Sequence, residues 1–320
     1  MNKKVLDYIL DFEDKKLRRK NGIILIDNDK VKEPSQLEDV PGTSIIYRSA
    51  IDGTQVFAKS FGVDSPLAMG VSRMFNKCEI ATPITTPITS YSGEIVLTVS
   101  QDLHEIGKKV NANTMTLEEY KRQRPKTTKT LFTLDEENKW GLLTNPRKKE
   151  IAKELMTKDC LDTINSTALL QECVTYTDGH RLNYIAFINP DTGIVECIAP
   201  IDLEFNEILY QTMFKCSDSK TAFKEFLQQP YFSATTFGGF DDEQTYSERL
   251  KTIQNLLNKG KLSKNNIAVL KTALEYNLGE ELEKLGKKAK AIKKHYNPSI
   301  EQAKYLWEYN RKHLGRDLGM

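Results

Sequence analysis

Hydrophobic residues follow a different pattern at the two ends of this chain. The first third contains short apolar runs bounded by turn residues, which is typical of strands. The last third carries apolar residues at helical spacing, as in Leu250, Ile253 and Leu257. Strands and helices that are segregated in this way predict an α+β fold and not alternating α/β units. The predicted strands are 23–26, 44–50, 54–60 and 94–99.

Several helices are predicted from the same periodicity. The last one should begin at Asn297-Pro298, because asparagine caps a helix and proline suits the first helical position. The polar, irregular segment 107–146 is interpreted as a crossing between lobes or an insertion. A loop is expected around Pro83 and Pro87. The other helices are expected at 3–18, 65–75, 147–156 and 159–173, and in most of the chain after residue 202.

The chemistry-bearing part of the chain is the run Asp178-Gly-His-Arg-Leu-Asn183. It precedes a predicted hairpin: the apolar run 184–188, a turn at 189–191, and a returning strand that ends at Asp202. Phosphoryl transfer needs these groups, because one carboxylate accepts the hydroxyl proton while an amide oxygen and a second carboxylate hold metal ions. A loop of common turn formers is the alternative interpretation of the run.

The composition of the chain limits the classes of protein to which it can belong. The chain has 320 residues, of which 39% are hydrophobic, enough for one two-lobed unit or two domains. The net charge of +2 indicates neither a nucleic-acid binder nor an acidic tail. No stretch is apolar enough to span a membrane, and the first residues do not resemble a signal peptide. Five scattered cysteines favour reduced thiols and a cytoplasmic location.

Several charged residues inside and outside the motif have a structural interpretation beside a functional one. Lys59 lies in an apolar strand, where a buried lysine needs a partner, although an edge-strand lysine that opposes aggregation is the alternative. His180 is expected to be structural. Arg181 is expected to face solvent, and binding of a phosphorylated side chain is the alternative. The basic run 287–294 follows several glutamates at helical spacing. It is interpreted as a solvated helix face and not as a nucleic-acid surface.

The motif with Lys59 upstream resembles the HipA-like bacterial serine/threonine kinases, in particular the compact CtkA-like members. The resemblance rests on the Asp-x-His-x-x-Asn loop at 178–183 and on Ile198-Ala-Pro-Ile-Asp202. It extends over about residues 40–230 through Val56-Phe-Ala-Lys59 and through the strand that starts at Glu94. It implies a protein-kinase-like fold with a β-rich N-lobe and a helical C-lobe, ATP and Mg²⁺ as cofactors, and a protein Ser/Thr hydroxyl as substrate.

The resemblance also implies the role of each residue. Asp178 would be the catalytic base. Asn183 and Asp202 would be metal ligands. Lys59 would contact the α and β phosphates, and Ser44 would lie over them. Main-chain groups at Gln101 and Asp102 would hold the adenine edge.

Two departures from the family leave other functions open. The helix at 65–75 has no acidic residue where the family pairs a glutamate with the lysine, and Asp64, Glu79 and Glu94 are candidate substitutes. Only Gly42 represents the Gly-rich loop. These departures leave open a weakened or regulated kinase, or a nucleotide-binding pseudokinase that acts as a partner-binding module. A small-molecule phosphotransferase, which shares the fold, is a further alternative.

The expected organisation has three parts. Residues 1–105 would form the N-lobe, residues 106–240 the C-lobe with the catalytic loop and hairpin, and residues 241–320 the helical C-terminal part of the C-lobe. An antitoxin-like regulatory protein is a candidate partner, and no membrane partner is expected.

Overall fold

The computed structural model describes most of the chain. Its described residues are 1–12, 17–20, 23–26, 37–39, 45–48, 55–60, 65–89, 95–124, 145–175, 178–179, 181–203, 218–231, 234–235, 243–288 and 293–320.

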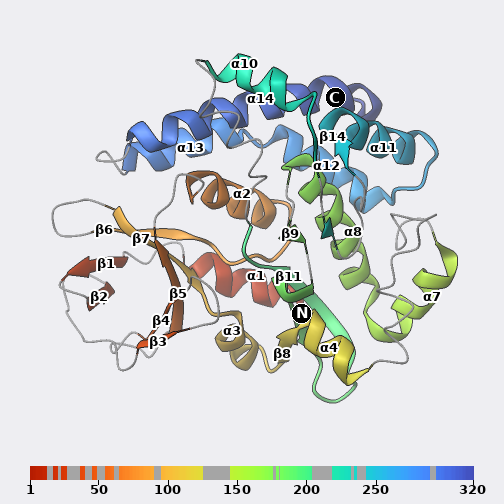
Figure 1. Cartoon of the computed structure of the whole chain (residues 1–320). Coiled ribbons are helices and arrows are strands. Elements are labelled where there is room, and N and C mark those ends of the chain that lie inside the picture. Colours follow the sequence, from red (N-terminus) through yellow and green to blue (C-terminus); the bar gives the residue numbers. More distant parts are fainter. Residues whose placement is uncertain are drawn as a thin grey trace.

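The larger sheet has seven strands in the order β2-β1-β6-β7-β5-β4-β3 (Figure 1). Its neighbouring strands pair antiparallel, except for β1 and β6, which are parallel. The predicted hairpin of β4 and β5 is confirmed, as are the predicted strands that became β2 and β7. The seven strands are β1 Leu17–Lys20, β2 Ile23–Ile26, β3 Leu37–Asp39, β4 Ile45–Arg48, β5 Gln55–Ser60, β6 Thr86–Thr89 and β7 Ile95–Gln101.

Strand β6 corrects the prediction of a loop around Pro87. Pro87 pairs with Thr98 of β7, while the bridge from β6 to β1 joins Thr89 to Arg18. Proline cannot donate a backbone hydrogen bond and is tolerated where one side of its strand is unpaired. Among the described residues, the bridge to β1 lies at Thr89, two positions after Pro87.

A second sheet has three antiparallel strands, and its central strand is buried on both faces. It has the order β11-β10-β8, with β8 at Asn113–Thr116, β10 at Tyr184–Ile188 and β11 at Val195–Pro200. Along β10, Tyr184 and Ala186 belong to the main apolar cluster, whereas the alternate residues belong to a smaller cluster around α1 and α3. Because side chains alternate between the faces of a strand, burial of both faces explains the unbroken apolar run of β10.

The helices largely follow the predicted pattern. The first ends at Asp11 and not at residue 18, because β1 uses Leu17–Lys20 to pair with β2. The last begins at Lys293, upstream of Pro298, so that proline lies inside it at the cost of one backbone hydrogen bond. The helices are α1 Asn2–Asp11, α2 Ser65–Lys77, α3 Leu103–Lys109, α4 Leu117–Gln123, α7 Pro146–Leu155, α8 Lys158–Cys173, α10 Ser219–Phe226, α11 Tyr246–Asn258, α12 Lys264–Glu275, α13 Leu278–Lys288 and α14 Lys293–Leu318.

The segment predicted as irregular over 107–146 contains regular structure. It includes β8, which pairs with β10, and α4. Helix α4 begins with a reciprocal cap, in which Thr116 accepts from the backbone of Glu119 and the Glu119 carboxylate accepts from Thr116. Residues 125–144 lie outside the described part of the chain.

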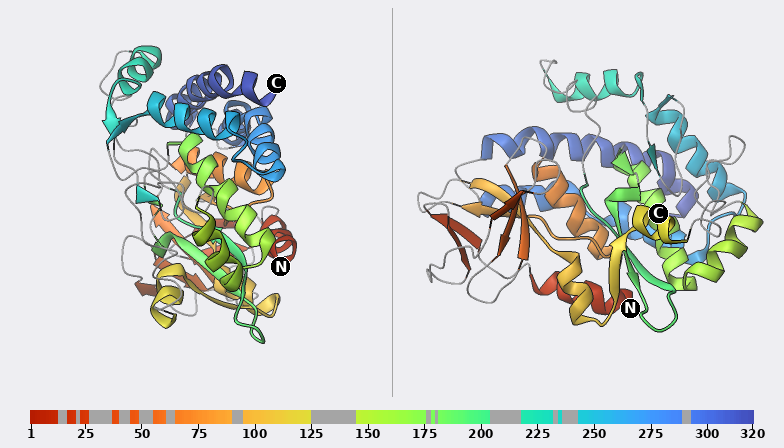
Figure 2. Two further views of the ribbon diagram at one scale, coloured as in Figure 1. Left: turned by 90° about the vertical axis from the view of Figure 1, so that its right-hand side faces the viewer. Right: turned by 60° about the horizontal axis from the view of Figure 1, so that its bottom comes forward.

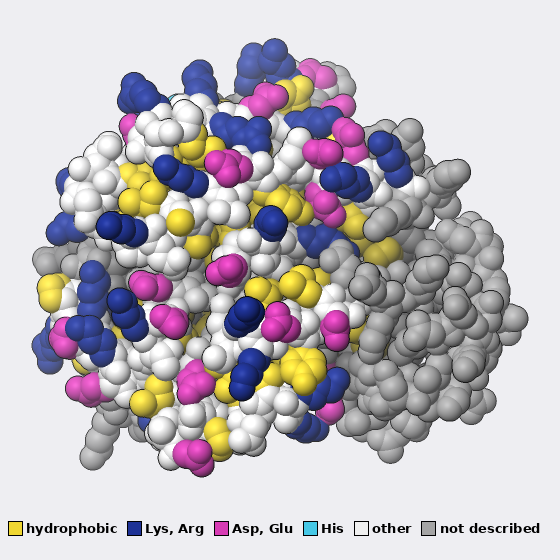
Figure 3. All heavy atoms as spheres, turned by 180° about the vertical axis from the view of Figure 1, so that it is seen from behind, with side chains coloured by type: hydrophobic (Ala, Val, Ile, Leu, Met, Phe, Trp, Pro, Cys, Tyr) yellow, Lys and Arg dark blue, Asp and Glu magenta, His cyan; other side chains and the backbone are white. Residues whose placement is uncertain are grey.

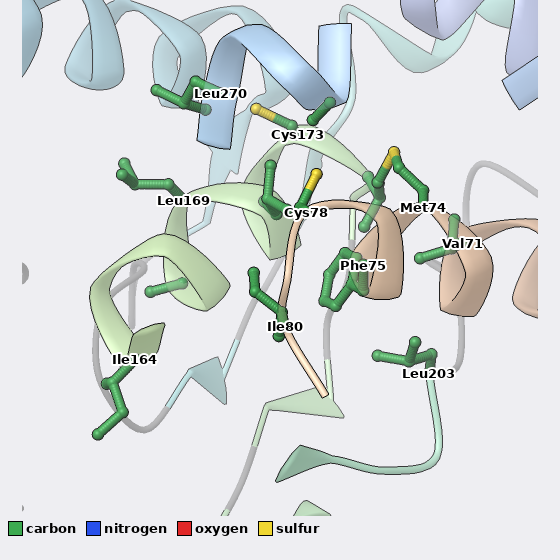
Figure 4. Close-up of a cluster of buried hydrophobic side chains, with 14 of the residues drawn as sticks. Val71, Met74, Phe75, Cys78, Ile80, Ile164, Leu169, Cys173, Leu203 and Leu270 are labelled. Carbon is green, nitrogen blue, oxygen red and sulfur yellow. The ribbon is translucent and has the colours of Figure 1, made fainter. Parts of the chain in front are cut away.

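Helix α2 joins the first third of the chain to its last third. It contacts α12, α13 and α14, and the views show α13 and α14 side by side next to it (Figures 1 and 2). Val71 and Phe75 of α2 face a cluster that includes Leu169 of α8 and Leu270 of α12 (Figure 4). One apolar core therefore spans segments that are far apart in sequence.

The visible surface mixes charges of both signs. On the rear face, Lys and Arg side chains alternate with Asp and Glu (Figure 3). Among the described helices, none is long and apolar enough to cross a membrane. The four described cysteines are free and buried, while Cys216 lies outside the described residues.

The contact between α2 and α13 yields a first prediction. A Cβ atom on Gly70 would lie 2.8 Å from Cδ2 of Leu282 and 2.9 Å from Cδ1 of Leu278. We expect Gly70→Val to lower the free energy of unfolding by about 1–3 kcal/mol, because overpacking displaces α13. Denaturant unfolding monitored by circular dichroism measures the change.

Gly315 of α14 is the matched control, because a Cβ there would meet only Met320 Cβ, at 3.9 Å. Gly315→Ala should raise stability by about 0.5–1 kcal/mol through helix propensity. Equal stability of Gly70→Val and the parent chain would contradict the close approach of α2 and α13.

Candidate functional site

The candidate loop is held by a small parallel sheet. Asp178–Gly179 forms β9, which pairs with β13 at Ala234–Thr235, and Asp178 lies opposite Ala234. A 3-10 turn at Arg181–Asn183 then leads into β10. The side chain of Asp178 and all of His180 lie outside what the structure describes. Two backbone pairings thus bracket the loop, one before it and one after it.

The hairpin register brings the backbones of Asn183 and Asp202, the two predicted metal ligands, close to each other. Tyr184 pairs with Pro200, and the Ile201 amide donates to the Asn183 carbonyl at 2.9 Å. This hydrogen bond continues the ladder past the end of β10, so Asp202 comes next to the 3-10 turn. The Asn183 side chain is buried, whereas Asp202 is exposed. Asn183 and Asp202 are therefore neighbours although the hairpin separates them in sequence.

Asp202 has a left-handed backbone conformation and is followed by a buried residue. Its φ of 53° is in the left-handed region, where aspartate and asparagine are enriched among residues other than glycine. The next residue, Leu203, is buried and lies among the apolar side chains below Val71 and Phe75 (Figure 4). The left-handed turn lets Leu203 enter the core while Asp202 stays exposed.

Arg181 is partly exposed, as predicted in part, but it also forms an ion pair that the prediction lacked. Its Nε donates to Oε2 of Glu118 at 2.6 Å, and the other Glu118 oxygen lies 3.5 Å from Nε of Arg122. The hydrogen bond from Arg181 holds the pKa of Glu118 below the usual range for glutamate. Sequence reasoning missed this contact because it missed α4, although Thr116-Leu-Glu-Glu119 matches a capping box.

Lys59 lies on β5, between β7 and β4, so the edge-strand alternative for this lysine is wrong. Lys59 pairs with Thr98, and Phe57 pairs with Ser100 on the same face of the sheet. Thr98 is buried. The Lys59 side chain lies outside the described part, and so does Ser44.

The side chains at the end of β7 have structural roles. Gln101 accepts from the Ile84 amide at 3.4 Å and donates to the Tyr8 carbonyl at 3.1 Å, which ties α1 to the strand. Asp102 caps α3 by accepting from the His104 amide at 2.8 Å. Burial raises the pKa of the Asp102 carboxyl, partly offset by this hydrogen bond. The predicted adenine contacts involve main-chain groups, of which the Asp102 carbonyl accepts from the Ile106 amide at 3.4 Å.

No acid within α2 is available to pair with Lys59, as the sequence indicates. Of the candidate substitutes, Glu79 is exposed at a left-handed turn, and Asp64 and Glu94 lie outside the described residues. An acid does reach α2 from α13: Oε1 of Glu281 lies 3.9 Å from Nε of Arg73, whose side chain is 9% exposed. The described acid nearest to α2 in an ion pair is therefore directed at Arg73.

The donor set suits a hard cation. Asn183 and Asp202 offer oxygen atoms, which Mg²⁺ prefers, and Mg²⁺ commonly uses one or two carboxylates together with substrate phosphates. Within the described ranges, no cluster of three or more His, Cys, Asp or Glu could hold a metal ion. A magnesium site completed by nucleotide phosphates does not require such a cluster.

Comparisons with solved structures show a kinase-like fold. The chain is similar to the proinflammatory kinase CtkA of Helicobacter pylori, with a TM-score of 0.50, 11% identity, and coverage of 88% of this chain and 94% of that one. It is also similar to HipA of Shewanella oneidensis MR-1, from a complex with HipB and operator DNA. There the TM-score is 0.45 and the identity 11%, over 97% of this chain and 71% of that one. No protein-family model matches the chain, and no curated protein matches it.

The cap of α3 yields a second prediction, made with two variants. Asp102→Ala should lower the free energy of unfolding by about 0.5–2 kcal/mol, because it removes the acceptor for the His104 amide. Asp102→Asn keeps an acceptor and removes a buried charge, so we expect it to be at least as stable as the parent chain.

The pH dependence follows from the raised pKa of Asp102. The folded chain binds this proton more tightly than the unfolded chain, so the cost of burying the carboxylate is present above the raised pKa and shrinks as pH falls through it. The advantage of Asp102→Asn should therefore be largest at neutral pH and fade in acid. Thermal unfolding at several pH values measures it, and an advantage that grew in acid would contradict the assignment.

Proposed function

We propose that this chain is an ATP-dependent, HipA-like kinase that transfers the γ-phosphoryl group to a serine or threonine hydroxyl of a protein, itself included. The observation that carries the proposal is the hydrogen bond from the Ile201 amide to the Asn183 carbonyl. It sets Asn183 beside Asp202 directly after β9, in a fold similar to that of a kinase. An aspartate, an amide oxygen and a second carboxylate on adjoining backbone segments are the groups that phosphoryl transfer requires.

Each residue has a distinct task in this proposal. Asp178, as an ionised carboxylate, orients the attacking hydroxyl and accepts its proton. The hydroxyl oxygen then bonds to the γ-phosphorus while the bond to the β–γ bridging oxygen breaks. Asn183 and Asp202 would hold Mg²⁺, which supplies charge neutralisation on the phosphate oxygens when it is bound. The remaining contribution of the protein is positioning and electrostatic stabilisation.

The nucleotide would lie against the sheet. Lys59 would bind the α and β phosphates from the interior strand β5, and Ser44 would lie over them. The backbone at Gln101 and Asp102 would hold the adenine edge. We also propose a two-lobed layout, with residues 1–105 as the N-lobe, 106–240 as the C-lobe and 241–320 as its helical C-terminal part. An antitoxin-like partner and a cytoplasmic location remain predictions.

The third prediction concerns the two aspartates. Asp178→Asn and Asp202→Asn should each lower the rate of phosphoryl transfer by at least about 100-fold. Asparagine is the sharper choice at residue 202, because it tolerates the left-handed backbone that alanine disfavours. Transfer from radiolabelled ATP to the chain itself, to protein substrates and to small alcohols measures the rate.

Asp191→Asn is the matched control, because Asp191 is exposed on the hairpin turn and its backbone amide makes the local bond to Asn189. If the rate of phosphoryl transfer is unchanged by substitution of either Asp178 or Asp202, the kinase assignment is wrong. Transfer to small alcohols but not to proteins would favour a small-molecule phosphotransferase.

A nucleotide-binding pseudokinase is the second candidate, and a specific observation favours it. Helix α2 carries no acid, and its Arg73 faces Glu281 of α13. The acid that the family's helix supplies to its nucleotide lysine is absent from α2, which is a reason for weak or absent transfer. A pseudokinase of this kind would bind ATP and regulate a partner protein without transferring a phosphoryl group.

The fourth prediction separates binding from transfer. ATP with Mg²⁺ at 100 times its Kd should raise the free energy of unfolding by about 2.7 kcal/mol, measured as a thermal shift. Lys59→Ala should reduce the shift at the same ligand concentration, whereas Lys261→Ala, on an exposed loop, should leave it unchanged. A shift without transfer supports the pseudokinase, and the absence of any shift contradicts both candidates.

A further inference from the structure

Arg249 of α11 is a fully buried arginine with partners on two other segments. Its NH1 donates to Oε2 of Glu172 at 3.3 Å, and its NH2 donates to the Tyr231 carbonyl at 2.6 Å. The guanidinium carbon also lies 4.3 Å from the centre of the Tyr231 ring. The Arg249 and Glu172 side chains are 0% and 1% exposed. A charge is buried this deeply only when such partners compensate its lost hydration.

The first partner lies where α8 ends, shortly before the candidate loop. Glu172 is in the last turn of α8, and other groups hold the same turn: Nδ2 of Asn310 donates to the Cys173 carbonyl at 2.9 Å. The hydroxyl of Tyr246 lies 2.8 Å from the same carbonyl. Helices α11 and α14 thus fix the point from which the chain leaves α8.

The backbone after α8 needs that support. Thr175 is buried and has a φ of 60°, in the left-handed region that a β-branched residue strongly disfavours. Such a conformation persists only when the surrounding structure over-determines it. Asp178 follows closely, so the contacts that hold the end of α8 also set the direction in which the chain enters β9.

The second partner controls the strand that pairs with β9. Tyr231 belongs to β12 at Pro230–Tyr231, which pairs with β14 at Gln244–Thr245 immediately before α11. Downstream of Tyr231, Ala234 lies opposite Asp178 in the pairing of β13 with β9. Arg249 therefore holds the chain just ahead of both members of that pair.

We propose that Arg249 is a positioning residue for the candidate catalytic loop, because it fixes the two segments whose pairing carries Asp178. This role rests on the proposed kinase function for its effect on rate. Arg249 lies within residues 231–320, for which no family pattern is evident. Its proposed role would connect this part of the chain to the candidate site. Arg249 touches no reacting group and acts through Glu172 and Tyr231.

The test uses the full-length chain with Arg249→Lys, which keeps the charge but cannot span both partners in the same geometry. We expect kcat for phosphoryl transfer to fall on the order of 100-fold through displacement of the loop, with KM for ATP little changed. Hydrogen exchange should accelerate in peptides covering 172–183 and 231–235 and stay unchanged across β10 and β11. Glu172→Gln, which retains the acceptor oxygen without the charge, gives the same comparison if Arg249→Lys does not fold.

Two controls separate positioning from general destabilisation. Tyr231→Phe keeps the carbonyl and the ring that Arg249 uses, so it should leave kcat and loop exchange unchanged. Asn266→Ala removes a buried hydrogen bond of 2.9 Å between α12 and Ser166 in the middle of α8, so it should lower stability without selectively exposing the loop.

The results that would overturn the positioning role differ from those that would overturn the proposed function. If Arg249→Lys lowers stability but leaves both kcat and exchange at 172–183 at the parent values, the positioning role is overturned. If the parent chain transfers no phosphoryl group, the proposed function fails, whereas the exchange comparison still decides whether Arg249 orders the loop.

Discussion

The antiparallel pairing of β10 with β11 is the interaction on which the rest of this structure depends. One face of the hairpin supplies Tyr184, Ala186 and Ile198 to the main apolar cluster, and the other supplies Ile185 and Phe187 to the cluster around α1 and α3. Since both clusters use the same backbone ladder, the hairpin cannot slip by one residue without exchanging its faces. The register that fixes the core also fixes Asn183 beside Asp202.

Contacts from distant segments surround this ladder and orient its ends. The Thr82 hydroxyl donates to the Pro200 carbonyl at 2.8 Å, and the Thr157 amide donates to the Val195 carbonyl at 3.0 Å. Leu203 anchors the chain after Asp202, and Glu118 holds Arg181 within the candidate loop. The candidate site therefore consists of the segments that flank a hairpin buried on both faces. Each of these segments is held by a different helix or loop.

Local pattern predicted the elements whose signal lies within one segment. The apolar run 184–188 and its Asn-Pro-Asp turn were enough to predict β10 and β11, and the periodicity of 65–75 predicted α2. Helix α4 was missed because its segment is polar, so that only the cap identifies it. The burial of Arg249 could not be predicted, because it depends on Glu172 and Tyr231, which only the folded chain brings to it. The placement of Asn183 beside Asp202 followed from the hairpin, whereas the side chains of Lys59 and Asp178 lie outside the described part.

The packing of α2 has a consequence for synthesis. Helix α2 contacts α13 and α14, which are made long after it. During translation its apolar residues therefore emerge long before their covering helices exist, and contacts of such large sequence separation form slowly. A nascent chain with exposed apolar surface is prone to aggregation until it closes. The yield of folded protein in a cell should thus depend on chaperone supply more than the stability of the finished fold would indicate.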